Sequence, residues 1–428
     1  MWNQVGPGRL ASLSLYALAN SYLWNSLHPL VLPFLLLTLV PEEVKGTALG
    51  GLTFVGLALA MFLQPITGTM SDRASWRWGR RRPFVLIGGL GICFVLSFMA
   101  PAPSFVWLLV GYLGLQVVGN VAQGAYQGFL PDLVPSAKRG AASGAKNAAE
   151  VLGIVIASVL TAALLTRVSP LSAFAGIGLV VLLGTVGTMA LLPEPAVTQA
   201  RDEFSLSEVF RVDLRRHAGF AWLVGSRFFT IVAITSVQTF ALFFIRDLIG
   251  VSDLEATVMT GSLITTIGVA ILVVAYPVGV AADRWGRKPF LFFAGGLGAL
   301  GALLMLAATS YLHLVLFGSL LGISTGIFLT TSWALFTDLV PDAEAARFLG
   351  LSNLATAGGA AAARLHGPLI DALNGVGHNL GYRVLFVLLA LWFVLGAALL
   401  VKVREQRPAQ VARPTLSPSP HSTGSGQA

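Results

Sequence analysis

The feature of this sequence that most constrains its fold is a charged loop that occurs twice, each time between long apolar segments. The first copy, Gly68–Phe84, contains five arginines and one aspartate, and the second, Gly279–Phe290, is a shorter version of it. An Asp-Leu-Val-Pro motif follows each copy, at Asp132 and at Asp338, so that the two motifs lie 206 residues apart. A repeat of this length predicts that the two halves of the chain share one fold.

The composition places the apolar segments in a membrane. Of the 428 residues, 55% are hydrophobic and 11% are charged, whereas soluble proteins carry about 25% charged residues. A bilayer core of ~30 Å requires ~20 apolar residues per helix, and the apolar segments reach that length. The single cysteine, Cys93, excludes a disulfide framework and a cysteine metal cluster. The first residues show no cleavable signal peptide, so we expect the first apolar segment to be retained.

We therefore predict an all-α polytopic membrane protein built from two pseudo-symmetric six-helix bundles. The predicted spans are 10–36, 45–71, 83–101, 104–130, 140–166, 171–192, 218–245, 254–281, 289–309, 311–337, 347–372 and 384–402. The predicted domains are residues 1–193 and 218–403 for the bundles, 194–217 for a cytoplasmic connector and 404–428 for a disordered cytoplasmic tail.

The basic residues predict the orientation of these spans. With both termini in the cytoplasm, only four of the 27 Lys and Arg residues fall on the opposite side, and three fall within spans: Lys45, Arg167, Arg246 and Arg383, then Lys146, Arg227 and Arg364. The other 20 lie on the cytoplasmic side, as the positive-inside bias requires. The net charge of +8 is thus explained by short loops beside a membrane, and we expect no nucleic-acid partner.

These features resemble a known family. Twelve spans in two similar halves, with Gly-x-x-x-Asp-Arg followed by Gly-Arg-[Arg/Lys] in the loops between spans 2–3 and 8–9, resemble the major facilitator superfamily over most of the chain. More narrowly, Ser71-Asp72-Arg73 and Trp78–Phe84 resemble the sucrose transporters and the wider glycoside–pentoside–hexuronide group. Asn120, Gln123-Gly124 and Leu130–Leu133 resemble the end of span 4 in the same sugar carriers.

Two departures from related families narrow the prediction. Span 2, Gly46–Thr69, contains no carboxylate, whereas the sodium-coupled melibiose branch places two aspartates there. Span 5 lacks the Gly-Pro pair of the drug–proton antiporters. The sequence therefore disfavours sodium coupling and, less strongly, drug export.

The charged loops are expected to form a cytoplasmic gate. A pairing of Arg73 or Arg80 with Asp132 would tie spans 2 and 4 together, and partly exposed pairs of ~0–1 kcal/mol suit a contact that breaks in every cycle. The residues predicted for this gate in the two halves are Asp72, Arg73, Arg80, Asp132, Asp283, Arg284 and Asp338. For Arg77, Arg81 and Arg82 we expect only a role in setting orientation.

Polar side chains at membrane depth are costly, so they are expected to face the interior of the bundle or a wet cavity. Amides, hydroxyls and tryptophans are also the groups that a neutral sugar requires. The residues predicted to bind the substrate are Asn20, Trp24, Asn25, Asn120, Gln123, Tyr126, Gln127, Arg227, Gln238, Trp333 and Arg364. The alternative for the amides is interhelical hydrogen bonding, and the symmetric pair Asn147 and Asn353 fits either role. For the tryptophans the alternative is the interfacial belt.

Glu150 is the deepest carboxylate in the chain, about ten residues into span 5. Desolvation would favour its protonated form and a nearby cation its charged form, so Glu150 is the predicted proton-coupling residue. The competing interpretation is a permanent ion pair with Lys146, Arg227 or Arg364. His28 precedes a proline, and we interpret it as structural.

The sequence leaves the substrate open. Our first hypothesis is a secondary active transporter in the plasma membrane that takes up a neutral sugar or glycoside with protons, as a monomer among membrane lipids. Two deep cations, Arg227 and Arg364, against one deep carboxylate instead favour an anionic sugar or organic acid. Further alternatives are a drug or metabolite exporter and a non-transporting sensor or assembly factor. No nucleotide loop, metal cluster or nucleophile–base pair stands out in the sequence, so we predict neither an enzyme nor a cofactor.

Overall fold

The computed structural model describes residues 7–74, 76, 78–134, 139–192, 194, 218–339 and 345–403. In this part of the chain the secondary structure is helical throughout. The helices of the first half are α1 (Pro7–Ser26), η1 (Leu27–Val31), α2 (Leu32–Leu39), η2 (Glu42–Val44), α3 (Lys45–Arg73), α4 (Arg82–Met99), α5 (Phe105–Gln127), α6 (Phe129–Leu133), α7 (Arg139–Ile156), η4 (Ala157–Thr161), α8 (Ala162–Arg167) and α9 (Pro170–Leu191). Those of the second half are α11 (Ala218–Ile249), α12 (Asp253–Trp285), α13 (Lys288–Leu304), η5 (Met305–Ala307), α14 (Tyr311–Leu339), α15 (Ala345–Arg364), α16 (His366–Asn374), α17 (Leu380–Leu399) and η7 (Leu400–Lys402).

The predicted all-α, multi-pass fold is confirmed. Within the described ranges, eleven segments are long and apolar enough to cross a membrane, and they correspond to eleven of the twelve predicted spans. The remaining span, 347–372, is made by α15 and α16, which are separated by a break at Leu365. The predicted tail lies outside the described residues, as does the predicted connector apart from Glu194.

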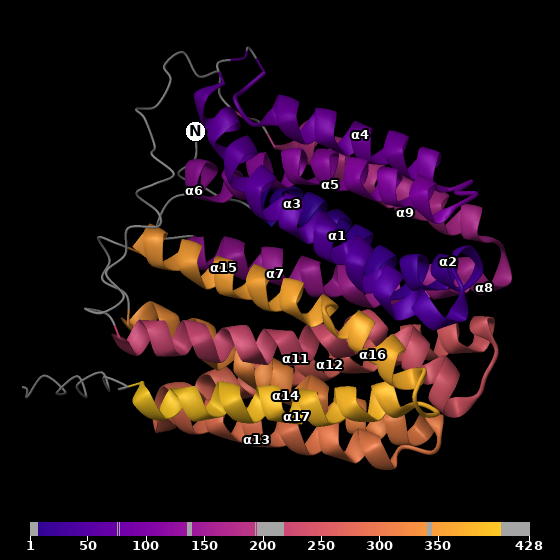
Figure 1. Ribbon diagram of the computed structural model, residues 1–428. Coiled ribbons are helices and arrows are strands. Elements are labelled where there is room, and N and C mark those ends of the chain that lie inside the picture. The colour runs from indigo at the N-terminus through magenta and orange to yellow at the C-terminus, as the bar shows by residue number, and fades with distance from the viewer. Residues whose placement is uncertain are drawn as a thin grey trace, which may run out of the picture.

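The two halves of the chain form two layers of long helices (Figure 1). Helices α1–α9 lie together in the upper part of that view, and α11–α17 lie together below them. The start of α1 and the end of α17 lie at the same end of the molecule, which we call the terminal end; the opposite end is the distal end. Between the layers, α3 contacts α15 and α16, and α12 contacts α7 and α8.

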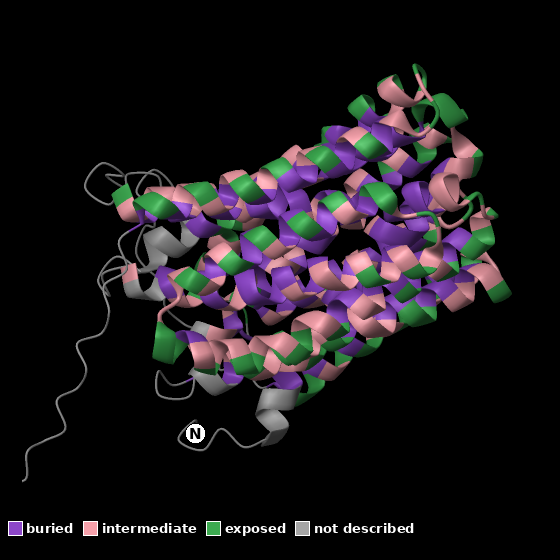
Figure 2. Cartoon of the chain, turned by 90° about the horizontal axis from the view of Figure 1, so that it is seen from below, coloured by how far each residue is buried: buried purple, intermediate pink, exposed green. Residues whose placement is uncertain are grey.

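The buried apolar side chains of the described residues form three clusters, and only the largest contains residues from both halves. The largest core cluster takes residues from both halves, with Tyr22 and Tyr112 of the first half beside Phe240 and Phe386 of the second. Two smaller clusters each belong to one half: one includes Tyr16 and Tyr126, and the other includes Phe220 and Phe336. The outer faces of the helices carry the exposed positions, while buried ones face inward (Figure 2). Exposed large apolar residues on such faces suit contact with lipid.

Glycines permit close contact between the halves at the distal end. A Cβ built on Gly50 of α3 would lie 2.3 Å from the carbonyl oxygen of Arg364, and one on Gly367 of α16 would lie 2.1 Å from the carbonyl oxygen of Gly46. Gly46 and Gly50 are four residues apart and therefore share one face of α3. Small residues at this spacing allow membrane helices to pack backbone against backbone. The α3–α16 contact thus depends on these glycines.

This contact gives a matched pair of substitutions. Gly50→Ala is expected to lower the melting temperature in detergent, because overpacking at a closed contact costs ~1–3 kcal/mol. Gly51→Ala is the control, since its Cβ would meet nothing within 4 Å and alanine is a better helix former. Equal melting temperatures for the two variants would contradict the close α3–α16 contact.

Candidate functional site

A network of arginines and carboxylates lies at the terminal end of the first half, and Arg81 is at its centre. Arg81 Nη2 lies 2.6 Å from Asp72 Oδ1, and its Nε lies 2.6 Å from Asp132 Oδ2. Arg80 also contacts Asp132. Both arginine side chains and Asp132 are largely buried. The expectation that Arg81 only sets orientation is therefore wrong, because Arg81 connects α3 with the segment after α5.

The electrostatics of this network hold Asp132 ionised. Burial raises the pKa of Asp132, but hydrogen bonds from Arg81 and Arg80 lower it by more, so the pKa lies below its usual value. Glu194 completes the network by accepting hydrogen bonds from the backbone amides of Arg81 and Arg82. These amides lie at the N-terminus of α4, where a carboxylate is favoured. Burial nevertheless raises the pKa of Glu194 above its usual value.

The second half repeats part of this arrangement. Arg287, the counterpart of Arg81 when counted back from the loop prolines, lies 3.5 Å from Asp283 and also contacts the carbonyl of Ala334. Gly79 and Gly286, each preceded by Trp, both adopt a positive φ, of 97° and 93°. The loop conformation is thus duplicated along with its sequence.

Another repeated contact holds the last helix of each half. Arg82 donates to the carbonyl of Met189, and Lys288 donates to the carbonyls of Val401 and Val403. A cation near the C-terminus of a helix is stabilised by the carbonyls there. Arg82, like Arg81, therefore does more than set orientation.

Three of the predicted gate residues differ from expectation or lie outside what can be described. Arg73 and Arg284 are exposed, and neither has an ion pair within the described residues. Of the two arginines predicted to pair with Asp132, Arg80 does so, together with Arg81, whereas Arg73 does not. The side chain of Asp338 lies outside the described residues.

A second group of polar residues runs along α1, η1 and α5 toward the middle of the molecule. His28 Nε2 lies 2.9 Å from Tyr112 Oη, and Gln116 Nε2 donates to the same oxygen at 2.7 Å. Asn120 donates to Gln116 Oε1, and the ring of Trp24 stacks on His28 at 5.3 Å. His28 lies in a π-helical turn, a deviation that often occurs at functional sites.

The two deep arginines of the second half differ in their surroundings. Arg227 on α11 donates to Thr356 at 2.8 Å and to Ser332 at 3.1 Å, and its guanidinium lies 5.8 Å from the ring centres of Trp333 and Phe336. Arg364 is 5% exposed and interacts electrostatically with His28 and Tyr112 of the other half. Arg227 therefore ties α11 to α14 and α15, whereas Arg364 faces the polar row of the first half.

Glu150 forms an ion pair within its own helix. Lys146 Nζ lies 2.6 Å from Glu150 Oε1, one turn away on α7, and both side chains are partly exposed. The carbonyl of Glu150 also accepts a hydrogen bond from Ser21 of α1. Of the cationic partners considered from the sequence, Lys146 is therefore the one that Glu150 contacts in this conformation.

Of the remaining residues predicted to bind the substrate, some bond to neighbouring parts of the protein and others are exposed or lack a partner among the described residues. Tyr126 is buried and donates to the carbonyl of Leu13, which indicates a packing role. Asn20 accepts from Trp24, and Asn25 donates to Ser21. The Oε1 atom of Gln123 is buried without a hydrogen-bond partner in the described part of the chain. Gln238 lines a small pocket. The exposed members of the predicted set are Gln127 and Trp333.

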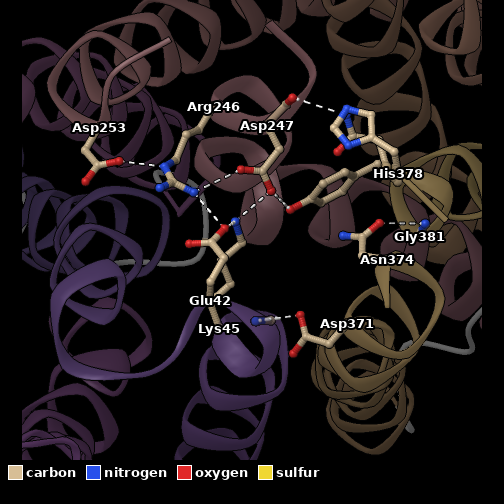
Figure 3. Close-up of polar contacts among 12 residues, drawn as sticks. Glu42, Lys45, Arg246, Asp247, Asp253, Asp371, Asn374, His378 and Gly381 are labelled. Atoms are coloured by element: carbon tan, nitrogen blue, oxygen red, sulfur yellow. Dashed lines mark hydrogen bonds and ion pairs between the residues drawn. The ribbon is translucent and has the colours of Figure 1, made fainter. Parts of the chain in front are cut away.

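The distal end carries a third cluster, which we call the distal cluster and define as Glu42, Lys45, Arg246, Asp247, Asp253 and Asp371 (Figure 3). The buried Lys45 of α3 lies 2.6 Å from Asp247 of α11, and Arg246 lies 2.7 Å from Glu42. Asp371 of α16 accepts from the backbone amides of Gly46 and Thr47, at the N-terminus of α3. A cavity of about 520 Å³ lies among these residues.

The distal cluster and its surroundings join the halves. Between residues that the structure describes, the hydrogen bonds and ion pairs that cross from one half to the other involve this cluster or the Ser158–Thr265 pair, at 2.7 Å. Among the described residues, the ion pairs of the arginine–carboxylate network at the terminal end connect residues of the first half. Polar contacts and the shared apolar core thus close the interface at the distal end and in the middle.

Sequence reasoning missed this cluster, although it contained a signal. Lys45 and Arg246 are two of the four basic residues that fall on the side opposite the positive-inside bias. Basic residues that depart from that bias need another reason to be there. Pairing with acidic residues about 200 positions away is such a reason, but no local pattern reveals the partner.

The sequence was compared with family models and with curated proteins. The family described as MFS/sugar transport protein matches residues 13–347. The multi-drug resistance efflux pump PmrA of Streptococcus pneumoniae is 22% identical over 355 residues, which cover 78% of this chain and 83% of the pump. The sucrose transport protein SUC4 of Arabidopsis thaliana is 28% identical over 95 residues, which cover 18% of this chain and 19% of SUC4. Proton-associated sugar transporter A of Homo sapiens is 34% identical over 85 residues, covering 20% and 11%.

Solved structures share the fold. A bacterial homologue of the human lysosomal transporter Spinster, in an inward-facing and unoccupied conformation, aligns with a TM-score of 0.73 at 16% identity, covering 93% of this chain and 97% of that one. A point mutant of the nucleoside transporter NupG aligns with a TM-score of 0.72 at 13% identity, covering 92% and 100%.

The terminal-end network predicts a pH-dependent stability. Asp132→Asn is expected to lower the melting temperature at pH 7, because it removes a carboxylate that two largely buried arginines contact. A carboxylate with a lowered pKa stabilises the fold fully above its unfolded pKa of about 3.9, and this contribution is lost as the pH falls through the folded value. The difference in melting temperature between the wild type and the variant should therefore shrink below about pH 4. Arg73→Gln, at an exposed position, is the control; an equal loss in both variants would contradict the network.

The distal cluster predicts a conformational effect. Lys45→Met leaves Asp247 without its buried cationic partner across the interface and should shift the population away from the closed distal end. Spin labels at Val44 and Val376, both exposed, in a Cys93→Ser background report the separation of the halves. Glu43→Gln is the control, since Glu43 lines the same cavity without an ion pair in the described residues. Unchanged distances in Lys45→Met would rule out a role for this contact in closure.

Proposed function

Because the chain belongs to the MFS/sugar transport protein family, we propose that it moves a sugar or glycoside across the cytoplasmic membrane by alternating access. Membership in this family makes it a multi-pass membrane transporter of a small molecule rather than an enzyme. The observation that carries the proposal for sugar is the family match itself, which covers residues 13–347. Local similarity to a sucrose transporter and to a proton-associated sugar transporter supports it further.

The uneven interface supports alternating access. A transporter requires two conformations in which opposite ends of one pathway are closed. Here the polar contacts between the described parts of the halves lie at the distal end and in the middle, while the terminal-end network of Arg81 and Asp132 lies within one half. Such a network is suited to keep the first half rigid as the halves rock against each other.

The distribution of basic residues supports an orientation with both termini in the cytoplasm. The distal end then faces outside, and the conformation described here is closed to the outside. We assign the two bundles to residues 1–193 and 218–403, joined by a cytoplasmic connector at 194–217. We further propose that the protein acts as a monomer in the lipid of the plasma membrane.

The cargo is proposed to bind between the polar row of the first half and the deep residues of the second. Trp24 and His28 present stacked rings, and Gln116 and Asn120 present amides, which together suit the apolar face and the hydroxyl groups of a sugar. Asn25, Gln123 and Gln238 remain proposed cargo contacts. Tyr126 and Arg227 are proposed to hold the helices around this site in place, Tyr126 through its bond to the Leu13 carbonyl and Arg227 through its bond to Thr356.

Proton coupling is proposed for Glu150. Its partner Lys146 lies on the same helix, so protonation of Glu150 would release Lys146 without breaking a contact between helices. Ser21 binds the backbone of Glu150 and would transmit a change at this position to α1, which carries Trp24 and ends at the π-helical turn of His28.

Export of a drug or metabolite is the second candidate function. It is favoured by the efflux pump PmrA, whose similarity extends over 78% of this chain, whereas the similarity to the sugar transporters covers about a fifth. The direction of net flux distinguishes the two candidates.

The proposal predicts proton-driven uptake in proteoliposomes. Radiolabelled sucrose and a panel of mono- and disaccharides are expected to accumulate when the outside is acidified. Glu150→Gln should abolish this accumulation while leaving exchange of labelled for unlabelled sugar, because a neutral side chain can no longer carry the proton. Glu43→Gln, a matched change at the distal end, should leave uptake intact.

The other outcomes are equally informative. Sugar-independent efflux of cationic dyes would favour the exporter. Absence of flux for every compound would overturn transport as the function of this chain. Full accumulation by Glu150→Gln would reject Glu150 as the coupling residue without affecting the proposal for sugar.

A further inference from the structure

We propose that Arg364 forms an anion subsite within the cargo site, so that the transported sugar or glycoside carries a carboxylate. The inference rests on the proposed function, since it specifies the chemical class of the cargo. In the described part of the second half, the buried guanidinium of Arg364 lacks the hydrogen-bond partners that the guanidinium of Arg227 has.

Arg364 is buried but incompletely satisfied. Its side chain is 5% exposed, and Nη1 donates to the carbonyl of Ala360 one turn earlier in α15. Within the described residues, Nε is buried without any hydrogen-bond partner and no carboxylate pairs with this guanidinium. A charge in the membrane interior is costly unless it is paired or reaches water. The edge formed by Nε and Nη2 is therefore free to receive an anion.

Arg227 shows how a structural arginine looks in the same bundle. Two hydroxyl groups, those of Thr356 and Ser332, accept its hydrogen bonds, and two aromatic rings lie against its guanidinium. These partners hold Arg227 in place with no need for a ligand. The contrast distinguishes a cation used for helix packing from one available to cargo.

The groups that face Arg364 across the interface are donors or neutral. His28 and Tyr112 are its electrostatic neighbours, and Gln116 continues the row with an amide. An oxyanion at Arg364 would thus meet further N–H or O–H groups and no repelling charge among them. Trp24, stacked on His28, would lie along the same row for the ring of a sugar.

The backbone is irregular on both sides of this position. Helix α15 ends at Arg364, and Pro368 lacks the N–H that would otherwise bond to the Arg364 carbonyl. Opposite it, His28 lies in the π-helical turn between α1 and α2. Broken helices near the middle of transporter bundles line binding sites, because irregular backbone is tolerated only beside a cavity or protein. The two breaks belong to different halves, and the side chains at them, Arg364 and His28, interact electrostatically.

The geometry of the free edge favours a carboxylate. Nε and Nη2 of a guanidinium present two parallel N–H groups, which match the two oxygens of a carboxylate in a bidentate pair. A hydroxyl group could satisfy only one of these donors and would leave the charge uncompensated. A sugar with one carboxylate therefore fits this position better than its neutral analogue.

The test compares ligands that differ at one carbon. Binding of p-nitrophenyl β-D-glucuronide and p-nitrophenyl β-D-glucoside, and of the corresponding galactose pair, is measured by calorimetry on the full chain in nanodiscs. The acidic member is expected to bind at least ~10-fold more tightly, which corresponds to ~1.4 kcal/mol. Arg364→Gln should remove this preference while leaving binding of the neutral member within a few-fold. Arg364→Lys keeps the charge but loses the two parallel N–H groups, so it should retain part of the preference for the acidic ligand. Arg383→Gln, at an exposed arginine, is the control.

Each outcome decides one point. Neutral ligands that bind and are transported without any preference for the acidic member overturn the anion subsite and leave the sugar transporter intact. Failure of both members of both pairs, together with absence of sugar flux, overturns the proposed function and the subsite with it. The third outcome concerns Glu150. If Glu150→Gln loses the acid preference as Arg364→Gln does, and the double variant regains it, then Glu150 is the partner of Arg364 in another conformation. That result would also overturn the subsite. Monodispersity and melting temperature establish that each variant is folded.

Discussion

The contact between Lys45 and Asp247 is the interaction on which the arrangement of the two halves depends most. It joins a lysine at the start of α3 to a carboxylate near the end of α11, and the lysine is almost completely buried. Each partner also has an ion pair within its own half, Lys45 with Glu42 and Asp247 with Arg246. The contact can therefore be broken as the halves separate without leaving either charge uncompensated. The adjacent glycines of α3 and α16 make the closed interface compact, and the surrounding carboxylates keep it polar.

The two ends of the molecule use charge differently. At the distal end, ion pairs cross between halves, so their formation changes with the distance between the bundles. At the terminal end, Arg81 connects Asp72 and Asp132 within one half, and Arg82 reaches the carbonyl of Met189 near the end of α9. Contacts of this second kind keep the terminal ends of the helices of one bundle together whichever way the bundle tilts. A rocking motion needs both: a breakable interface and rigid bodies on either side.

Much of the fold could be predicted from sequence, because span length and positive-inside bias act over short stretches of chain. The charged loops were also recognised, and Arg80 was one of the two residues predicted to pair with Asp132. The exclusion of Arg81 was wrong, since three consecutive arginines, 80–82, give no indication of which of them point inward. The distal cluster was missed because Lys45 and Asp247 are about 200 residues apart and neither belongs to a motif. The contrast between Arg227 and Arg364 was likewise invisible, as it depends on hydroxyl groups from neighbouring helices.

The repeat itself explains why the chemistry is asymmetric. A Cβ on Gly153 would meet the carbonyl of Leu18, and one on Gly359, 206 residues later, would meet the carbonyl of Phe228, so the packing of α1 on α7 recurs between α11 and α15. Around this shared contact the chemistry differs, because position 150 carries a carboxylate and its counterpart, position 356, carries the threonine that binds Arg227. Arg364 has Ser158 as its counterpart, and Ser158 is satisfied by Thr265 across the interface. Symmetric positions carry the packing that both halves need, so a residue that differs between the halves, such as Arg364, is available for the proposed contact with cargo.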